Sequence, residues 1–570
     1  MESFFEPECC VSLVNRRIKT MRCFNYFLKR KFTHYLRLEE FILLIAILLR
    51  LWGLEWKVPH FDEGINGWFA DQIRIKGFYA YDPTNYHGPL YFYVIFIFQT
   101  LFGRHLWALR LPAVISSLGS VWLALRFDRF IGKQAALLAA LALAVSPAAV
   151  FYGRYSIHES SLVFSLMLLT FGLFGLWQVG DRRSLWIAVT GATLLLLLKE
   201  TAVIHLGCFI LAAVVLLFLE REACFMPSQQ WSRRDLIKAI LISFGSLFFF
   251  YSGTLLNGEG LLHVFQTIPA WVHTGMGAGG HEKIEYQIGW FNFYWIVLMI
   301  RYEWPSLIGF FYAGWILTQK KTLILLRYLA IYALGALAAY SLIPYKTPWC
   351  IVSIIWPFAL LFGNLSSNST AVAMRCVAPV LVSSSMKDTL RDCAPSTPCA
   401  SSTAANFKRG FLWVMPLLLS LGLIHSFVSC MRLNFWHYVD FSEPYVYVQT
   451  SPEIKRVTEP LLKMVQQDPR NLQLRGQVFL ESYYPLPWIF GDFTAIGYYS
   501  QSSPPRKWNG DFILVEAAQA PQVEQQLQEP YYQIPFQLRD AMEPCVGFFK
   551  KKSFQSYFEK QGLSGYGSTQ

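Results

Sequence analysis

The chain has few charged residues. They make up 15% of its 570 residues, against about 25% in an ordinary soluble domain, whereas 54% of the residues are hydrophobic and 17% aromatic. This deficit excludes a wholly soluble protein, and the high apolar content excludes a disordered one. The net charge of +12 could suggest nucleic acid, but its distribution, described below, indicates a membrane surface. No nucleic-acid partner is expected.

Cysteine motifs and internal repeats are also absent from the sequence. The eleven cysteines occur singly or as the pair Cys9 and Cys10, with no C-x-x-C and no Cys/His spacing of a zinc site. We interpret them as small hydrophobic side chains or reduced thiols. We expect no cofactor and name no metal-ligating residues, and the sequence leaves a divalent metal open. No internal repeat is evident, which argues against a transporter built from inverted repeats.

Long apolar runs dominate the chain. A run of roughly 17–25 apolar residues can cross a bilayer, and we count eleven runs that approach or reach this length. A basic segment, residues 1–37, precedes the first run and is followed by no cleavage site, which predicts a signal anchor. The predicted spans lie near residues 38–56, 111–125, 134–152, 161–178, 185–198, 202–219, 239–257, 304–318, 328–343, 348–363 and 411–430.

The distribution of Lys and Arg predicts the orientation of these spans, because cytoplasmic loops are enriched in both residues. With the N-terminus in the cytoplasm, the cytoplasmic segments hold 25 basic residues and the outer segments before residue 431 hold 10. This assignment requires that the short apolar stretches 89–102 and 288–300 do not cross, and we predict that they are interfacial. The chain is therefore expected to be a multi-pass protein of the cell (inner) membrane with an extracytoplasmic C-terminal domain.

The composition changes after the last span. Residues 431–570 are mixed in polarity, with an amphipathic helical pattern at 452–467 and strand-like runs at 477–480 and 511–515. They predict a small α/β domain. Residues 364–410 are rich in Ser, Thr and Ala, which predicts a flexible cytoplasmic loop. The expected fold class is a mainly α, polytopic membrane protein with about eleven transmembrane helices, spanning 38–430, and this small C-terminal domain.

Polar residues gather at the outer boundary of the predicted membrane, in the segments 57–110, 153–160, 199–201 and 344–349 and at the start of the eighth span. Ionisable residues at such a boundary are candidate functional residues. Each also has a structural alternative: capping of a helix, an Arg154–Glu159 ion pair, snorkelling of Lys199, or membership of an aromatic belt. The candidates are Asp62, Glu63, His87, Arg154, His158, Glu159, Lys199, Glu303, Tyr345, Lys346 and Trp349.

The order of several short motifs resembles a known family. The acidic pair Asp62-Glu63 is followed by His87-Gly88-Pro89-Leu90, by Arg110-Leu111-Pro112 and by Arg154-x-x-x-x-Glu159. This order is similar to that of the type-C integral-membrane glycosyltransferases, which include protein O-mannosyltransferases and the aminoarabinose transferase of lipid A. Lys199-Glu200-Thr201 sits where those enzymes often carry a Lys-Gly-Pro-like turn. The stretches 86–93, 344–349, 444–450 and 484–488 look closer to a bacterial and archaeal branch named for association with flippase activity.

The resemblance implies transfer of a sugar from a polyprenyl-phosphate donor, at the membrane lipid surface, to an acceptor that is a protein, a lipid or a glycan. It implies that Asp62 is the general base, that Glu159 orients the acceptor or Asp62, and that the reaction inverts the anomeric centre. The candidate cations for the donor phosphate are Lys199, Arg154 and Lys346, so no divalent metal is required. The expected substrate-binding residues are Glu63, His87, His158, Glu303, Tyr345 and Trp349, with Trp271 as a further stacking residue.

Two alternatives belong to other classes of protein. A transporter or flippase for lipid-linked sugars needs polar residues spread through the depth of the membrane, whereas here they cluster at one boundary. A flippase-associated assembly subunit would keep the fold without the activity.

Overall fold

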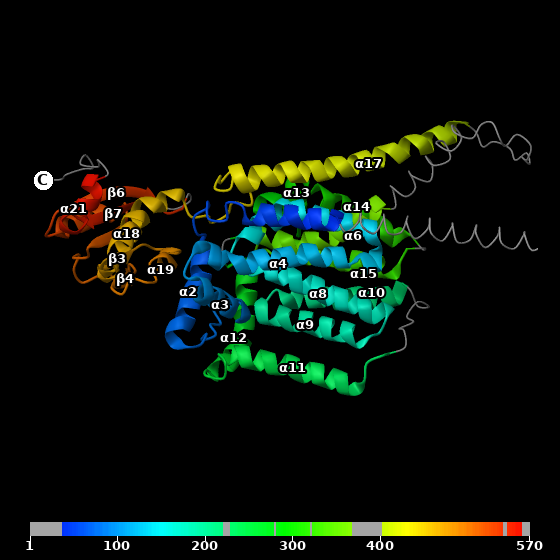
Figure 1. The fold of residues 1–570 in the computed structure, drawn as a ribbon, viewed down its shortest axis with the longest axis horizontal. Coiled ribbons are helices and arrows are strands. Elements are labelled where there is room, and N and C mark those ends of the chain that lie inside the picture. The colour runs from blue at the N-terminus through cyan, green and yellow to red at the C-terminus, as the bar shows by residue number, and fades with distance from the viewer. Residues whose placement is uncertain are drawn as a thin grey trace, which may run out of the picture.

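The computed structural model describes residues 37–219, 229–278, 281–319, 322–367, 402–539 and 544–560. Long helices form a bundle, and a mixed α/β region lies at one end of it (Figure 1). The predicted basic N-terminus and most of the predicted flexible loop 364–410 lie outside the described residues.

All eleven predicted spans fall on helices. Their apolar composition favours helices long enough to cross a bilayer, and successive helices run in opposite directions (Figure 1). The helices are residues 37–51, α4 (Leu106–Arg126), α6 (Lys133–Val145) with α7 (Pro147–Phe151), α8 (Glu159–Gln178), α9 (Arg182–Leu198), α10 (Ala202–Leu219), α11 (Arg233–Tyr251), α14 (Trp304–Thr318), α15 (Ile324–Leu342), residues 351–367, and α17 (Ser402–Met431).

Six helical stretches within the described residues are long and apolar enough to cross a membrane, and the bent pair of α6 with Pro147–Arg154 would make a seventh. The other predicted spans fall short for identifiable reasons. The described part of the first helix has 15 residues, α9 has 17 and α14 has 15, whereas α11 carries several charged residues in its first two turns. Apolar side chains are exposed along α10, α11 and α17, as expected of faces that meet lipid. The protein is a multi-pass membrane protein.

Several shorter helices lie at the end of the bundle that carries the α/β region. Helix α2 (Phe61–Lys76) runs across this end, with α3 (Leu90–Phe102) packed between it and α4 (Figure 1). Helix α12 (Glu259–His273) lies at the same end, and α13 (Tyr294–Tyr302) has only 9 residues. Of the two stretches predicted not to cross, 89–102 forms the short helix α3, whereas 288–300 begins in a two-stranded β-hairpin and continues into α13. That neither stretch crosses the membrane stays a prediction.

The C-terminal region contains a five-stranded sheet in the order β4-β3-β5-β7-β6. Strand β3 is parallel to β4 and β5, whereas β7 is antiparallel to β5 and β6. Helices α18 and α21 pack on one apolar face and α20 on the other. The predicted helix and both predicted strand-like runs are present. The bounds are α18 (Lys455–Gln467), α19 (Leu486–Ile489), α20 (Ala520–Gln526), α21 (Lys551–Lys560), β3 (Gly476–Phe479), β4 (Ile496–Tyr499), β5 (Phe512–Glu516), β6 (Tyr531–Gln537) and β7 (Pro544–Lys550).

Helix α2 joins the two parts because two of its glycines let α19 approach closely. A Cβ on Gly64 would lie 2.4 Å from Pro485 Cα, and a Cβ on Gly67 would lie 2.3 Å from Trp488 Cδ1. Arg104, after α3, donates to carboxylates of both parts, at 2.7 Å to Asp71 and 2.8 Å to Asp492. The start of α2 is thus held between the bundle and the C-terminal region.

Candidate active site

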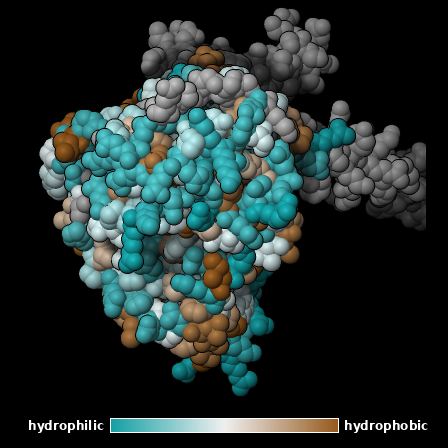
Figure 2. Space-filling model, turned by 90° about the vertical axis from the view of Figure 1, so that its left-hand side faces the viewer, coloured by the Kyte–Doolittle hydropathy of each residue, from teal (hydrophilic) through white to brown (hydrophobic). Residues whose placement is uncertain are grey.

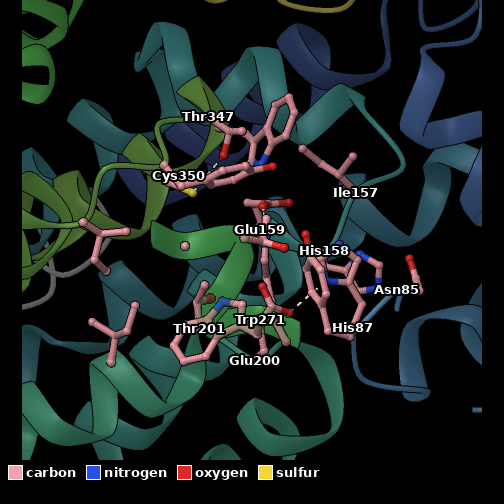
Figure 3. A pocket seen from close by; sticks show the side chains of 18 of the residues that line it. Asn85, His87, Ile157, His158, Glu159, Glu200, Thr201, Trp271, Thr347 and Cys350 are labelled. Atoms are coloured by element: carbon pink, nitrogen blue, oxygen red, sulfur yellow. Dashed lines mark hydrogen bonds and ion pairs between the residues drawn. The ribbon is translucent and has the colours of Figure 1, made fainter. Parts of the chain in front are cut away.

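A cavity of about 470 Å³ lies at this end of the bundle. Its walls come from the start of α2, the loop before α3, the turns before α8 and between α9 and α10, the end of α12, and the segment after α15. Figure 3 shows Glu159 between the two histidines on one side and Thr347 and Cys350 on the other. The predicted residues that line it are Asp62, His87, His158, Glu159, Lys199, Tyr345 and Trp349, together with Trp271.

Asp62 lies in the first turn of α2, and His60 caps this helix. The Asp62 N–H donates to His60 Nδ1 at 3.1 Å, and His60 Nε2 lies 2.8 Å from the Tyr447 carbonyl oxygen, to which it donates. These two bonds define a neutral imidazole, and burial lowers the pKa of His60, which keeps it neutral. The Asp62 carboxylate, 3.7 Å from the unprotonated Nδ1 and 30% exposed, is therefore not held in an ion pair with His60.

Glu159 and Lys199 form a buried ion pair in the cavity wall. Glu159 begins α8 and Lys199 follows α9, and Lys199 Nζ donates to Glu159 Oε1. Burial lowers the pKa of Lys199, but the charges of Glu159 and Glu200 outweigh burial and raise it well above its ordinary value. Lys199 is therefore a charged ammonium within the cavity wall.

A second carboxylate in the cavity wall, Glu200, is in direct contact with His87: Glu200 Oε2 lies 2.8 Å from His87 Nδ1 (Figure 3). Burial raises the pKa of Glu200, but the charge and hydrogen bond of His87 and the charge of Lys199 lower it overall. The sequence prediction missed Glu200 as a site residue. Its position directly after Lys199, in the same turn between two apolar runs, was a signal that could have identified it.

Glu63 was predicted to bind substrate, but it lies outside the cavity. Arg110 donates to both of its carboxylate oxygens, at 2.8 and 2.7 Å, and the N–H groups of His60 and Ser156 occupy them as well. Burial raises the pKa of Glu63, but Arg110 and Lys57 outweigh burial and lower it to about 2. Both oxygens of the Glu63 carboxylate are therefore fully used in hydrogen bonds within the protein.

Glu303 is also used within the fold. Its carboxylate accepts from the Ala148 N–H at 2.7 Å and from Ser146 Oγ at 2.8 Å, and so it supports the start of α7. It does not line the cavity, and the expectation that it binds substrate is corrected accordingly.

Two of the three predicted phosphate-binding cations are placed outside the cavity. The Arg154 guanidinium donates to the carbonyls of Leu49, at 2.9 Å, and Gly53, at 2.8 Å, at the end of the first helix. Lys346 Nζ, completely buried, donates to carbonyls of residues 341 and 343 at the end of α15. Both side chains donate to backbone carbonyls at or just beyond helix ends, where carbonyls can lack intrahelical partners. The alternative of an Arg154–Glu159 ion pair is also corrected, since Glu159 pairs with Lys199.

No group of three or more His, Cys, Asp or Glu side chains is placed to hold a metal ion within the described ranges. The expectation that no metal is required remains a prediction.

Part of the chain matches a known family and curated relatives. Residues 86–243, which include His87, Glu159 and Lys199, match the family described as dolichyl-phosphate-mannose-protein mannosyltransferase. The mannosyltransferase-like proteins YycA and YkcB of Bacillus subtilis (strain 168) are 32% identical over 139 residues and 29% identical over 145 residues. The matches cover 22% and 23% of this chain, and in each case 20% of the relative. The chain thus spans about a fifth of the length of these relatives.

The similarity in fold extends over more of the chain than the similarity in sequence. ArnT from Cupriavidus metallidurans bound to undecaprenyl phosphate superimposes with a TM-score of 0.54 at 14% identity, over 90% of this chain and 97% of ArnT. Its apo form gives a TM-score of 0.51 at 15% identity, over 90% and 98%. The chain therefore has the fold of ArnT, as expected for a type-C integral-membrane glycosyltransferase, and its residues 86–243 match the dolichyl-phosphate-mannose-protein mannosyltransferase family.

Proposed function

We propose that this protein is a membrane glycosyltransferase that moves a sugar from a polyprenyl-phosphate donor to an acceptor on the extracytoplasmic face. One observation carries the proposal: Asp62, Glu159 and Lys199, which lie on three distant segments, line a single cavity. The matched family is named for a dolichyl-phosphate carrier and ArnT is bound to undecaprenyl phosphate. These names support a polyprenyl-phosphate carrier here and make mannose the first sugar to test.

Asp62 is the proposed general base. Its carboxylate lines the cavity and the neighbouring His60 is neutral, so the carboxylate can accept the proton of an acceptor hydroxyl. The acceptor oxygen bonds to the anomeric carbon while the bond from that carbon to the phosphate oxygen breaks, and the electron pair leaves with the phosphate. A single displacement of this kind inverts the anomeric centre.

Lys199 is the proposed phosphate-binding cation, because a charge placed in advance stabilises the negative charge that develops on the leaving phosphate. Glu159 would then position the Lys199 ammonium, which refines its expected role of orienting the acceptor or Asp62. Tyr345, Trp349 and Trp271 are apolar surfaces of the same cavity, suitable for stacking on a sugar or packing on the first isoprenoid units.

The test is transfer by the purified full-length protein from a polyprenyl-phosphate-linked mannose, with Asp62→Asn as the variant. We expect loss of detectable transfer, because the amide cannot take the proton, with unchanged membrane insertion and thermal unfolding. Asp82→Asn is the matched control, because Asp82 lies in the same outer segment but outside the cavity wall. Normal turnover by Asp62→Asn would remove the assigned base.

A flippase differs from this proposal in needing access from both membrane faces. The cavity residues come from one end of the helices, which favours chemistry at one surface. Reconstitution in liposomes separates the two functions: we expect no movement of a fluorescent lipid-linked sugar between leaflets, and rapid movement without transfer would favour the flippase.

The proposed orientation places the C-terminal region outside the cytoplasm. The side of the molecule that carries this region is largely hydrophilic, with smaller hydrophobic patches at its upper left and lower edge (Figure 2), which suits contact with water. A cysteine at the exposed position Ser502 should react with an impermeant thiol reagent added to intact cells. A cysteine at the exposed position Arg183, in the first turn of α9, should react only after the membrane is opened, and the reverse pattern would overturn the orientation.

A further inference from the structure

His60 connects the proposed general base to a segment that leads into the C-terminal region. It is the N-cap residue of α2 and is 1% exposed. Its Nδ1 accepts the N–H of Asp62 at 3.1 Å, and its Nε2 lies 2.8 Å from the carbonyl oxygen of Tyr447, which is 387 residues away in the sequence. The ring therefore joins the first turn of α2 to a remote part of the chain.

The two partners allow only one form of the His60 ring. A backbone N–H can only donate, so Nδ1 must present its lone pair to Asp62, and a backbone carbonyl can only accept, so Nε2 must carry the hydrogen. If the hydrogen moved to Nδ1, the ring would no longer cap α2 and would instead face the Asp62 carboxylate, whose Oδ2 lies 3.7 Å away, with a donor. The Tyr447 carbonyl thus determines whether His60 holds the Asp62 backbone or competes for its carboxylate.

We call residues 445–450 the strap, because they connect the helix bundle to the sheet of the C-terminal region. The Tyr152 hydroxyl donates to the first carbonyl of the strap at 3.1 Å. Near its other end, the completely buried Gln449 accepts from the Tyr155 hydroxyl at 2.5 Å and donates to the Val58 carbonyl at 3.3 Å. These bonds hold both ends of the strap against the bundle.

The strap is strained at Val448, directly after Tyr447. Its φ is 51°, in the left-handed region that is unfavourable for a β-branched side chain. Rotation about this φ turns the peptide plane that carries the Tyr447 carbonyl, so relaxation of Val448 would move the carbonyl away from His60. Strained backbone of this kind persists only where its surroundings hold it, and it is concentrated at functional sites.

Two aromatic rings hold the His60 ring behind the cavity wall. The ring centres of Tyr155 and Trp349 lie 4.9 and 6.1 Å from that of His60, and both contacts are edge-to-face. Trp349 lines the cavity, whereas His60 itself does not. His60 can therefore affect a substrate only through the residues that it holds.

Resting on the function proposed above, we propose that His60 is a positioning residue for the general base, and that the strained strap selects the ring form in which it acts. Through Nδ1, His60 fixes the backbone of Asp62 in the first turn of α2. Because Nδ1 carries no hydrogen, the Asp62 carboxylate is not bonded to His60 and can take the proton of the acceptor. The strap that leads into the C-terminal region thereby becomes part of the site.

Two variants separate this role from a general contribution to stability. His60→Asn and His60→Gln both remove the ring, but asparagine is among the best N-cap residues and keeps an acceptor for the Asp62 N–H. With the purified full-length protein and a polyprenyl-phosphate-linked mannose, we expect kcat in His60→Asn to stay within about threefold of the unchanged protein. In His60→Gln, we expect kcat to fall about a hundredfold, because the base is displaced. KM for the lipid donor should stay unchanged in both.

Val448→Gly tests the strap, because glycine adopts a φ of this sign without enforcing it. We expect kcat to fall about tenfold, since the carbonyl that orients His60 becomes mobile, without a lower unfolding temperature. In the His60→Asn background the same change should have no further effect, because no ring form is left to select. Leu255→Gly is the matched control: Leu255 has a φ of 70°, is 63% exposed and lies outside the cavity wall, so kcat should not change.

Nitrogen NMR of the full-length protein with labelled histidines gives a readout that needs no turnover, since a ring nitrogen with a hydrogen and one without give distinct signals. The signals of His60 are those that disappear in His60→Asn. We expect a neutral ring with its hydrogen on Nε2 in the unchanged protein, and a mixture of both neutral forms in Val448→Gly.

A hydrogen on Nδ1 of His60 in the unchanged protein would overturn the proposal, as would an equal kcat in His60→Asn and His60→Gln. If His60→Gln does not fold, as judged by thermal unfolding, Val448→Gly decides: an undiminished kcat, or an equal further loss in the His60→Asn background, would contradict the proposal. Absence of transfer by the unchanged protein would overturn the proposed function and with it this role, and the NMR result would show that the ring form is nevertheless as described.

Discussion

Two buried ion pairs lie at the same end of the helix bundle and differ in how much of their hydrogen-bonding capacity is already used. In the pair Glu63–Arg110, both carboxylate oxygens accept two hydrogen bonds, and the guanidinium also donates to backbone carbonyls of residues 54, 57 and 58. In the pair Glu159–Lys199, one ammonium meets one carboxylate at the wall of a cavity.

The comparison shows how to separate structural from functional charges in this protein. A buried charge needs partners. Where the partners come from the fold and the group lies outside the cavity, as for Glu63, Arg154 and Lys346, the side chain holds segments together. Where the fold supplies one partner and leaves a cavity beside it, as for Lys199, the remaining capacity is available to a substrate.

Neutralising the pair at the cavity should give the largest change in activity. In Glu159→Gln/Lys199→Gln the two amides can still bond to each other, so no unpaired charge is buried, and the free energy of unfolding should change by less than about 1 kcal/mol. We expect kcat/KM for sugar transfer to fall about a thousandfold, because the cation facing the phosphate is lost. Transfer within tenfold of the unchanged protein would mean that this pair is structural.

Neutralising the enclosed pair should change stability more than chemistry. Glu63→Gln/Arg110→Gln leaves the carbonyls of residues 54, 57 and 58 without their donor, and we expect the free energy of unfolding to fall by about 3 to 5 kcal/mol. Thermal unfolding of the purified protein measures this loss. If the unfolding temperature is unchanged while transfer falls a thousandfold, the Glu63–Arg110 pair is functional rather than structural, which contradicts the prediction.

Lys346 should give the smallest effect. Its ammonium already bonds to carbonyls at the end of α15, so Lys346→Gln should change KM for the lipid donor less than about threefold while lowering stability slightly. If KM changes as much as it does when Lys199 is neutralised, the original expectation that Lys346 binds the donor phosphate is supported instead.

Most of the fold could be predicted from the sequence because its signals are local. Apolar length indicates helices such as α8 and α15, and the shortness of the apolar stretch 89–102 matches the 13 residues of α3. The site was less accessible. Lys199, Lys346 and Arg154 look alike in sequence, each a cation at the end of an apolar run, yet only Lys199 lines the cavity.

The sequence by itself indicated the apolar helices of the bundle and the gathering of acids and bases at one end, because hydrophobicity and charge act on each segment separately. Only the tertiary structure decided which of those side chains face the cavity. Whether a side chain faces the cavity depends on contacts between segments remote in sequence, such as that between His87 and Glu200. It also depends on whether backbone carbonyls lie close enough to bind a cation, as they do for Arg154.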